Sequence, residues 1–337
     1  MAKKRRAKRQ TRASDLRPGQ SEHVPSYDYS RVSLKDSYAR AAAVFDEVGR
    51  ELMQEFGLNG VDVGRKLVDG YQTGVYSIRA YVSEKKDQPK EKALPENIHG
   101  VPVDVIQAEF APAELQAPDR LGRNGTNLTG RMTALVTTPG LEHGEMLLTC
   151  AHVVAGGGAT LSDRKQTLQQ RVDVVNNGGT IVGATLTGEG INWRWSTLYD
   201  CALIAPVGDP SQFLPDMRSS RFRLLNPPTD LTSADVNVTI VKRPSPSSPT
   251  SAHEAHVRSI RSVLSETTGL MLEDHYLVEA VSGVFAAPGD SGSLVFSNDT
   301  TPIGMVRAVS TNTLSNTNLV VLTPIRRTMG ILGITFA

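Results

Sequence analysis

The sequence has only two cysteines, Cys150 and Cys201, and aromatic residues make up 5% of its 337 residues. So few cysteines exclude a small scaffold held together by several disulfides. No apolar run approaches the 18 or more residues of a membrane-spanning helix, and the first residues lack the apolar core of a secretory signal. These absences predict a protein of the reducing cytoplasm with no transmembrane segment.

The formal net charge of +1 hides an uneven distribution along the chain. Residues 1–12 contain seven basic residues and no acidic one, whereas residues 13–337 carry 29 basic and 35 acidic residues. A segment of this kind can contact nucleic acid or an anionic surface, or it can be a solvated tail. It has no aromatic side chain, so a stacking platform for single-stranded nucleic acid is not supported.

Hydrophobic residues make up 39% of the chain and charged residues 21%, as in an ordinary globular protein. From about residue 130, short apolar segments alternate with Gly, Pro, Asn and Asp turns, a texture typical of an all-β barrel or sandwich. The strands predicted from this pattern are residues 132–137, 145–150, 180–186, 201–206, 236–241, 275–281, 294–297, 303–308 and 318–324.

The region before this pattern predicts a small α+β module. Ser33 can cap a helix whose apolar residues recur at steps of three and four as far as Phe56, and Gly57 suits its end. Strands are predicted at residues 61–67, 76–82 and 101–106. The apolar stripe of the helix is expected to pack on these strands.

Three short strings supply the residue types of nucleophilic catalysis. TCAH ends at His152, DCALI begins at Asp200, and GDSGS at residues 289–293 is centred on Ser291. A serine hydroxyl needs a neighbouring base to become a nucleophile, histidine is suited to that task, and a buried carboxylate fixes the imidazole tautomer. Each string alone also fits a strand end or a turn, but together they predict a Ser-His-Asp triad.

The order of these residues, with gaps of 48 and 91 positions, resembles the chymotrypsin-like serine proteases over about the last 210 residues. The resemblance implies two six-stranded antiparallel β-barrels, one on each side of Pro227-Pro228, with the active site between them. It also implies that the N–H groups of Gly289 and Ser291 form the oxyanion hole. The expected activity is that of an intracellular serine endopeptidase acting on protein or peptide substrates, with no cofactor and no metal.

The same resemblance suggests a pocket for the substrate side chain that precedes the cut. The residue six positions before Ser291 would lie at its base, and that residue is Phe285. With no acid there, a preference for Arg or Lys is disfavoured, and a small or medium uncharged side chain is predicted. The walls of the pocket would come from Arg307, Ala308, Val309 and Val320.

The N-terminal module also resembles known regions. Residues 78–82 and 100–105 are similar to a module found before the trypsin-like domain in some bacterial peptidases, and to the corresponding region of the plant narrow-leaf proteases. It holds no nucleophile or metal-ligand cluster, so a structural, assembly or regulatory role is expected. The resulting domain scheme is a disordered basic tail (1–32), the α+β module (33–110), a linker (111–127) and the double-barrel protease domain (128–337).

Several alternatives stay open at this level. In activated secreted relatives, the residue at the position of Asp290 pairs with a newly cut N-terminus. No activation-like Ile-Val-Gly-Gly string precedes His152 here, so the sequence does not identify a partner for Asp290. The chain could instead be a protease-fold scaffold with latent or little activity, or an esterase with the same triad. Cys150 and Cys201 could be packed thiols or a redox pair, and a homo-oligomer is possible.

Overall fold

The computed structural model divides the chain into two compact units, Met1–Ile106 and Gln107–Ala337. The predicted basic tail (1–32) lies outside the described residues. The domain boundaries drawn from the sequence stay predictions. The structure describes residues 33–68, 71–85, 93–112, 121–125, 130–138, 145–156, 162, 166–167, 169–176, 179, 181–185, 195–196, 200–208, 227–242, 253–267, 269–297, 301–311 and 318–336.

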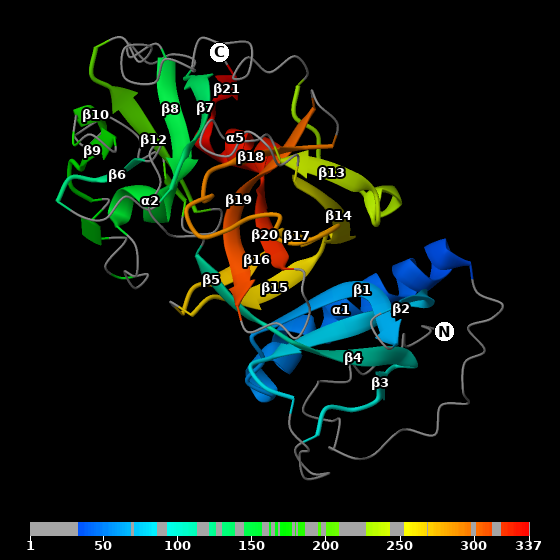
Figure 1. The fold of residues 1–337 in the computed structure, drawn as a ribbon. Helices are drawn as coiled ribbons and strands as arrows, with labels where there is room; N and C mark the ends of the chain where they lie inside the picture. Colours follow the sequence, from blue (N-terminus) through cyan, green and yellow to red (C-terminus); the bar gives the residue numbers. More distant parts are fainter. Residues whose placement is uncertain are drawn as a thin grey trace, which may run out of the picture. The chain divides into compact units, whose positions relative to one another are not determined.

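The described part of the first unit contains one helix and an antiparallel set of strands, as predicted. The Ser33 side chain caps the helix by accepting the N–H of Asp36 at 3.2 Å. The buried face of the helix lies against β1 and β2 (Figure 1), where the rings of Tyr38 and Tyr76 meet edge to face with centroids 5.1 Å apart. The elements are α1 (Leu34–Glu55), β1 (Gly60–Val68), β2 (Tyr71–Val82), β3 (Asn97–Ile98) and β4 (Val101–Gln107), with the strands in the order β1-β2-β4-β3.

The second unit is mainly β, and the predicted chymotrypsin-like architecture is confirmed. In one sheet β18 pairs with both β13 and β19, so six strands close into a barrel in the order β18-β13-β14-β17-β20-β19, and β5 is added to β19. Its strands are β5 (Glu109–Pro112), β13 (Thr239–Lys242), β14 (His253–Ser259), β17 (Tyr276–Ala280), β18 (Leu294–Phe296), β19 (Pro302–Thr311) and β20 (Leu319–Pro324).

The other sheet of this unit is a half-barrel in the described part of the chain. Seven strands follow the order β21-β7-β8-β12-β10-β9-β6, and β11 pairs beside β12. Its strands are β6 (Leu121–Arg123), β7 (Met132–Thr137), β8 (Glu145–Cys150), β9 (Asp173–Asn176), β10 (Ile181–Thr185), β11 (Trp195–Ser196), β12 (Cys201–Pro206) and β21 (Thr335–Phe336).

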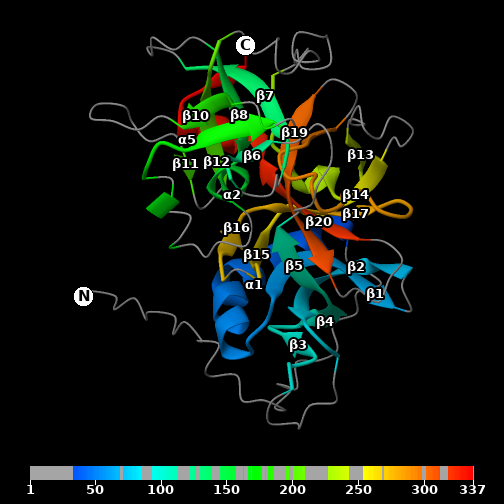
Figure 2. The same ribbon diagram turned by 60° about the vertical axis from the view of Figure 1, so that its left-hand side comes forward.

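The end of the chain returns to the half-barrel. After β20, the helix α5 (Ile325–Leu332) lies next to strands of this sheet (Figures 1 and 2), and β21 pairs with β7. Ile325, Leu332 and Ile334 belong to the same buried cluster as the apolar residues of β8 and β12. The half-barrel therefore receives its last strand, β21, only after all the strands of the closed barrel have been formed. Among the described helices, none is long and apolar enough to cross a membrane.

The β15 (Ser262–Ser265) and β16 (Met271–Glu273) hairpin leads to a buried histidine, His275. Its Nδ1–H donates to the carbonyl oxygen of Glu273 at 2.8 Å. Burial lowers the pKa of His275 to about 4, below its ordinary value of 6.5, although the Glu273 hydrogen bond opposes this. At pH values between 4 and 6.5 the unfolded chain binds a proton there that the folded chain does not, so the free energy of unfolding falls as the pH falls.

We therefore expect His275 to make the second unit acid-sensitive. A shift of this size corresponds to a loss of about 2.5 kcal/mol between pH 7.5 and 4.5. His275→Gln cannot titrate, so its stability should fall by about that much less over the same pH interval. Urea unfolding at the two pH values, followed by tryptophan fluorescence, measures the difference. Equal losses in the wild type and the variant would contradict the assignment.

Candidate active site

His152 and Asp200 are brought together by the pairing of β8 with β12. Cys150, the last residue of β8, lies opposite Cys201, the first residue of β12. His152 follows in the short helix α2 (Ala151–Ala155), and Asp200 precedes β12 with a positive φ of 45°. The backbone N–H of His152 donates to Asp200 Oδ1 at 3.0 Å, and His152 Nδ1 is hydrogen-bonded to Asp200 Oδ2. This arrangement fixes the imidazole ring on the carboxylate.

Ser291 comes from the closed barrel, at the turn before β18. Its Oγ lies 2.7 Å from His152 Nε2 and 3.2 Å from the carbonyl oxygen of Arg307. Gly289 and Gly292 on either side have φ values of 97° and 90°, which side chains rarely allow. A Cβ on Gly292 would also lie 2.2 Å from the carbonyl oxygen of Arg131. The glycines of the GDSGS string thus permit the turn that presents Ser291 to the imidazole.

Asp290 is held by two cations of the same unit. Its Oδ2 accepts from Lys242 Nζ at 2.5 Å and from the N–H of Ala287 at 3.0 Å, and its Oδ1 lies 3.2 Å from Arg131 Nε. Burial alone would raise the pKa of Asp290, but Lys242 and the hydrogen bonds bring that pKa below its ordinary value. The partner of Asp290 that the sequence left open is therefore Lys242, together with Arg131.

A buried ion-pair chain continues behind the histidine. Arg307 of β19 has no exposed surface; its Nη1 contacts Asp200 Oδ2, and its Nη2 lies 2.8 Å from Glu266 Oε1. Sequence reasoning named Arg307 only as a pocket wall and missed Glu266. The sequence did hold one sign of a buried charge, because Arg307 is the single charged residue in the otherwise apolar stretch 302–309.

A comparison with known protein families identifies the family of this chain. A model of the trypsin-like peptidase domain matches residues 133–305, which is just over half of the chain. The chain belongs to the trypsin-like peptidase family. Members of this family act on peptide substrates, and the match includes His152, Asp200 and Ser291.

Solved structures similar to this trypsin-like peptidase include several serine proteases. A glutamic acid-specific serine protease that uses a histidine triad in substrate binding is 14% identical over 66% of this chain and 100% of its own, with a TM-score of 0.41. Thermobifida fusca protease A is 10% identical over 65% and 96%, with a TM-score of 0.39. Rv3671c of M. tuberculosis, in an inactive form, is 17% identical over 64% and 87%, with a TM-score of 0.33. No curated protein sequence matched.

The predicted substrate-pocket residues of this peptidase are all buried. Phe285, Val309 and Val320 belong to one apolar cluster, and Lys242 Nζ lies 5.9 Å from the centre of the Phe285 ring. Ala308 is buried in β19, where it lies between β20 and β5. The guanidinium of Arg307 is directed to Asp200 and Glu266. The pocket assignment stays a prediction.

Cys150, His152 and Asp200 offer donor atoms within 4.8 Å of one another. A thiolate is the metal-binding form of cysteine, and burial raises the pKa of Cys150 to about 12, which disfavours that form. The imidazole Nδ1 is already hydrogen-bonded to Asp200. These donors therefore fit a metal poorly. Both cysteines are buried as thiols and lie directly opposite each other across β8 and β12.

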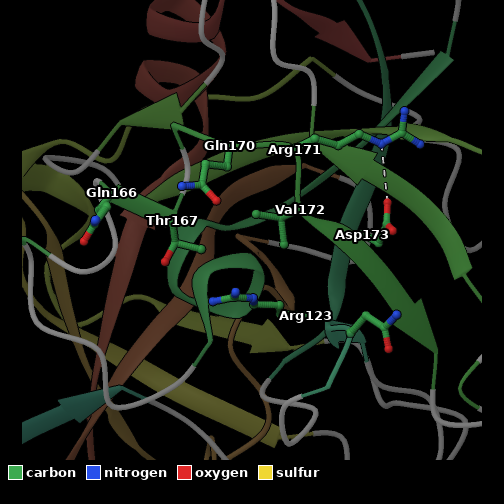
Figure 3. Close-up of a pocket in the computed structure, with 8 residues that line it drawn as sticks. Arg123, Gln166, Thr167, Gln170, Arg171, Val172 and Asp173 are labelled. Carbon is green, nitrogen blue, oxygen red and sulfur yellow. Dashed lines mark hydrogen bonds and ion pairs between the residues drawn. The ribbon is translucent and has the colours of Figure 1, made fainter.

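A cavity of about 500 Å³ lies elsewhere on the half-barrel, on β6 and β9 (Figure 3). Its lining is polar, and Arg171 and Asp173 form an exposed ion pair at 3.4 Å there. None of its lining residues belongs to the triad. The lining residues are Arg123, Asn124, Gln166, Thr167, Gln170, Arg171, Val172 and Asp173.

Proposed function

We propose that this peptidase is a serine endopeptidase in which Ser291 is the nucleophile. The observation that supports this most directly is the 2.7 Å separation of Ser291 Oγ and His152 Nε2, with His152 Nδ1 bonded to Asp200. In the proposed first step, Oγ attacks the scissile carbonyl carbon as Nε2 takes its proton. Asp200 holds the ring in the required tautomer and stabilises the imidazolium that forms.

The second half of the proposed reaction returns the proton. The imidazolium of His152 donates it to the leaving amine, and the peptide C–N bond breaks to leave an acyl-enzyme on Ser291. Water then attacks the ester with His152 again acting as base, which releases the acid and restores the hydroxyl. The N–H groups of Gly289 and Ser291 are the proposed donors to the oxyanion, and the positive φ of Gly289 supports a turn of that kind.

The cellular setting is part of the proposal. The setting proposed is a reducing cytoplasm, on the ground that the sequence has only two cysteines. Contact of residues 1–12 with nucleic acid or an anionic surface, and assembly into a homo-oligomer, remain sequence-based predictions.

A latent peptidase is the second candidate, and strand β5 favours it. Because the Arg307 carbonyl lies beside Ser291 Oγ, an extended peptide whose carbonyl reaches Oγ would run along β19. That edge pairs with β5, in the register Ala308 with Pro112 through Thr311 with Glu109. His152 and Ser291 also have no exposed surface. In a latent form, the chain's own strand would exclude substrate.

Labelling with a fluorophosphonate probe tests the proposed function. We expect the intact protein to form one adduct, mapped to Ser291 by mass spectrometry, and Ser291→Ala to form none. Absence of an adduct on folded wild-type protein would contradict an assembled site. In the latent case, Ala111→Pro should restore labelling by weakening the pairing of β5, while Ala111→Val, which keeps the N–H, should not.

A further inference from the structure

Behind the triad, three charged side chains form a buried row. Asp200, Arg307 and Glu266 each expose 2% or less of their side chains. Buried charges are stable only when paired, and here a single guanidinium contacts both carboxylates. The row begins at His152 Nδ1 and ends at Glu266 Oε1, so four side chains follow one another through direct contacts.

The charges of this row explain why Glu266 is needed. Arg307 alone would cancel the negative charge of Asp200, which is the charge that stabilises an imidazolium. With Glu266 the group has one excess negative charge while His152 is neutral, and it becomes neutral when His152 is protonated. The second carboxylate therefore restores the electrostatic stabilisation that the arginine removes.

The backbone holds Glu266 in place. Its N–H donates to the carbonyl oxygen of Leu270 at 2.9 Å, and its own carbonyl accepts the N–H of Gly269 at 2.8 Å, in the turn between β15 and β16. Arg307 lies in the middle of β19, and its carbonyl accepts from Ser291 Oγ. The guanidinium thus lies between Asp200 and the turn that carries Glu266, and the backbone of its own strand contacts the nucleophile.

We propose that Glu266 and Arg307 are positioning residues that act through Asp200 to set the basicity of His152. The inference rests on the proposed function, because it assigns a role in the same reaction. The alternative is that the pair only stabilises the fold. The two roles differ in one measurable property: a structural pair affects the amount of folded protein, whereas a positioning pair affects the pH at which His152 becomes protonated.

The other titratable groups near the site do not change between the variants below. Cys150 and Cys201 are buried next to the row, and the Cys150 thiol is neutral at ordinary pH. On the side of Ser291, Asp290 is paired with Lys242 and Arg131. The charged groups that distinguish wild type from variant are therefore Glu266 and Arg307 alone.

Glu266→Gln is the first test, because it removes the charge and keeps the shape. We expect the acid limb of the pH profile of Ser291 phosphonylation to move to lower pH by roughly one unit, and the plateau rate to fall several-fold, since His152 becomes a weaker base. Glu266→Asp keeps the charge and should leave the limb in place. Glu279→Gln removes a carboxylate paired with Arg258 at 2.6 Å in the same barrel, and should leave the whole profile unchanged.

The double variant Glu266→Gln with Arg307→Gln covers the case in which the single variant fails to fold. It restores the single negative charge of Asp200 without leaving an unpaired buried guanidinium, so the limb should return to its wild-type position. A limb that does not move in Glu266→Gln, or one that stays shifted in the double variant, would overturn the inference.

A direct measurement of the His152 pKa distinguishes this inference from the proposed function. The pKa of the His152 imidazole can be followed by NMR in the full-length protein without any turnover. A lower His152 pKa in Glu266→Gln supports the inference even if no probe reacts with Ser291, in which case the proposed function alone fails. An unchanged His152 pKa in a protein that does react rejects the inference and leaves the proposed function intact.

Discussion

Replacing Asp200 with asparagine is expected to slow phosphonylation of Ser291 at neutral pH by roughly 10⁴-fold. Both oxygens of Asp200 bond to His152, Oδ1 to the backbone N–H and Oδ2 to Nδ1, and Oδ2 also contacts Arg307. The amide of asparagine can donate to Nδ1, which would place the remaining ring proton on Nε2, facing Ser291. The base would then have no lone pair for the serine proton.

The second-order rate constant of probe labelling measures this effect without a known substrate. Asp173→Asn is a suitable control, because Asp173 is a partly exposed carboxylate of the same unit whose ion pair with Arg171 is on the surface. It should label at the wild-type rate. A loss of less than about tenfold in Asp200→Asn would be inconsistent with the role proposed for Asp200.

The second large effect is expected in the first unit, where Arg79→Met should lower the free energy of unfolding by about 3–5 kcal/mol. Arg79 donates to both oxygens of Asp62, at 2.7 and 2.5 Å, and both side chains are buried. Burial alone would lower the pKa of Arg79, but Asp62 holds that pKa above its ordinary value. Without the arginine, Asp62 would lose both of these hydrogen bonds, and the hydroxyl of Tyr81, which donates to Oδ2 at 3.2 Å, carries no charge to replace the guanidinium.

Urea unfolding followed by circular dichroism at 222 nm is suited to this test, because the 22-residue α1 of the first unit is the longest helix described. Arg171→Met removes an exposed pair and should lose less than about 1 kcal/mol. Replacing both partners with apolar residues, Asp62→Leu with Arg79→Met, should recover most of the loss, because no unpaired charge remains. If Arg79→Met and Arg171→Met lowered the free energy of unfolding by similar amounts, the buried pair would have no special role.

Local patterns predicted most of the elements. The strands at 132–137, 145–150 and 201–206 have their predicted bounds, because each is a short apolar segment between turn residues. The helix begins at the predicted cap. The short strands and helices that were not predicted have polar, interrupted or very short sequences that carry no clear periodicity: β3, β5, β6, β9, β11, β14, β15, β16, β21, α2 and α5.

The sequence by itself determined the candidate triad residues, because nucleophilic catalysis requires those residue types and because glycines flank the serine where a tight turn must form. Only the tertiary structure decided what surrounds them. Three arrangements join residues between 41 and about 200 positions apart: the pairing of Asp290 with Lys242, the row from His152 to Glu266, and β5 on the edge of β19. Such contacts depend on strand register and on how the two sheets of the second unit close. No local pattern encodes them, because a buried charge is recognisable as paired only when its partner's position is known.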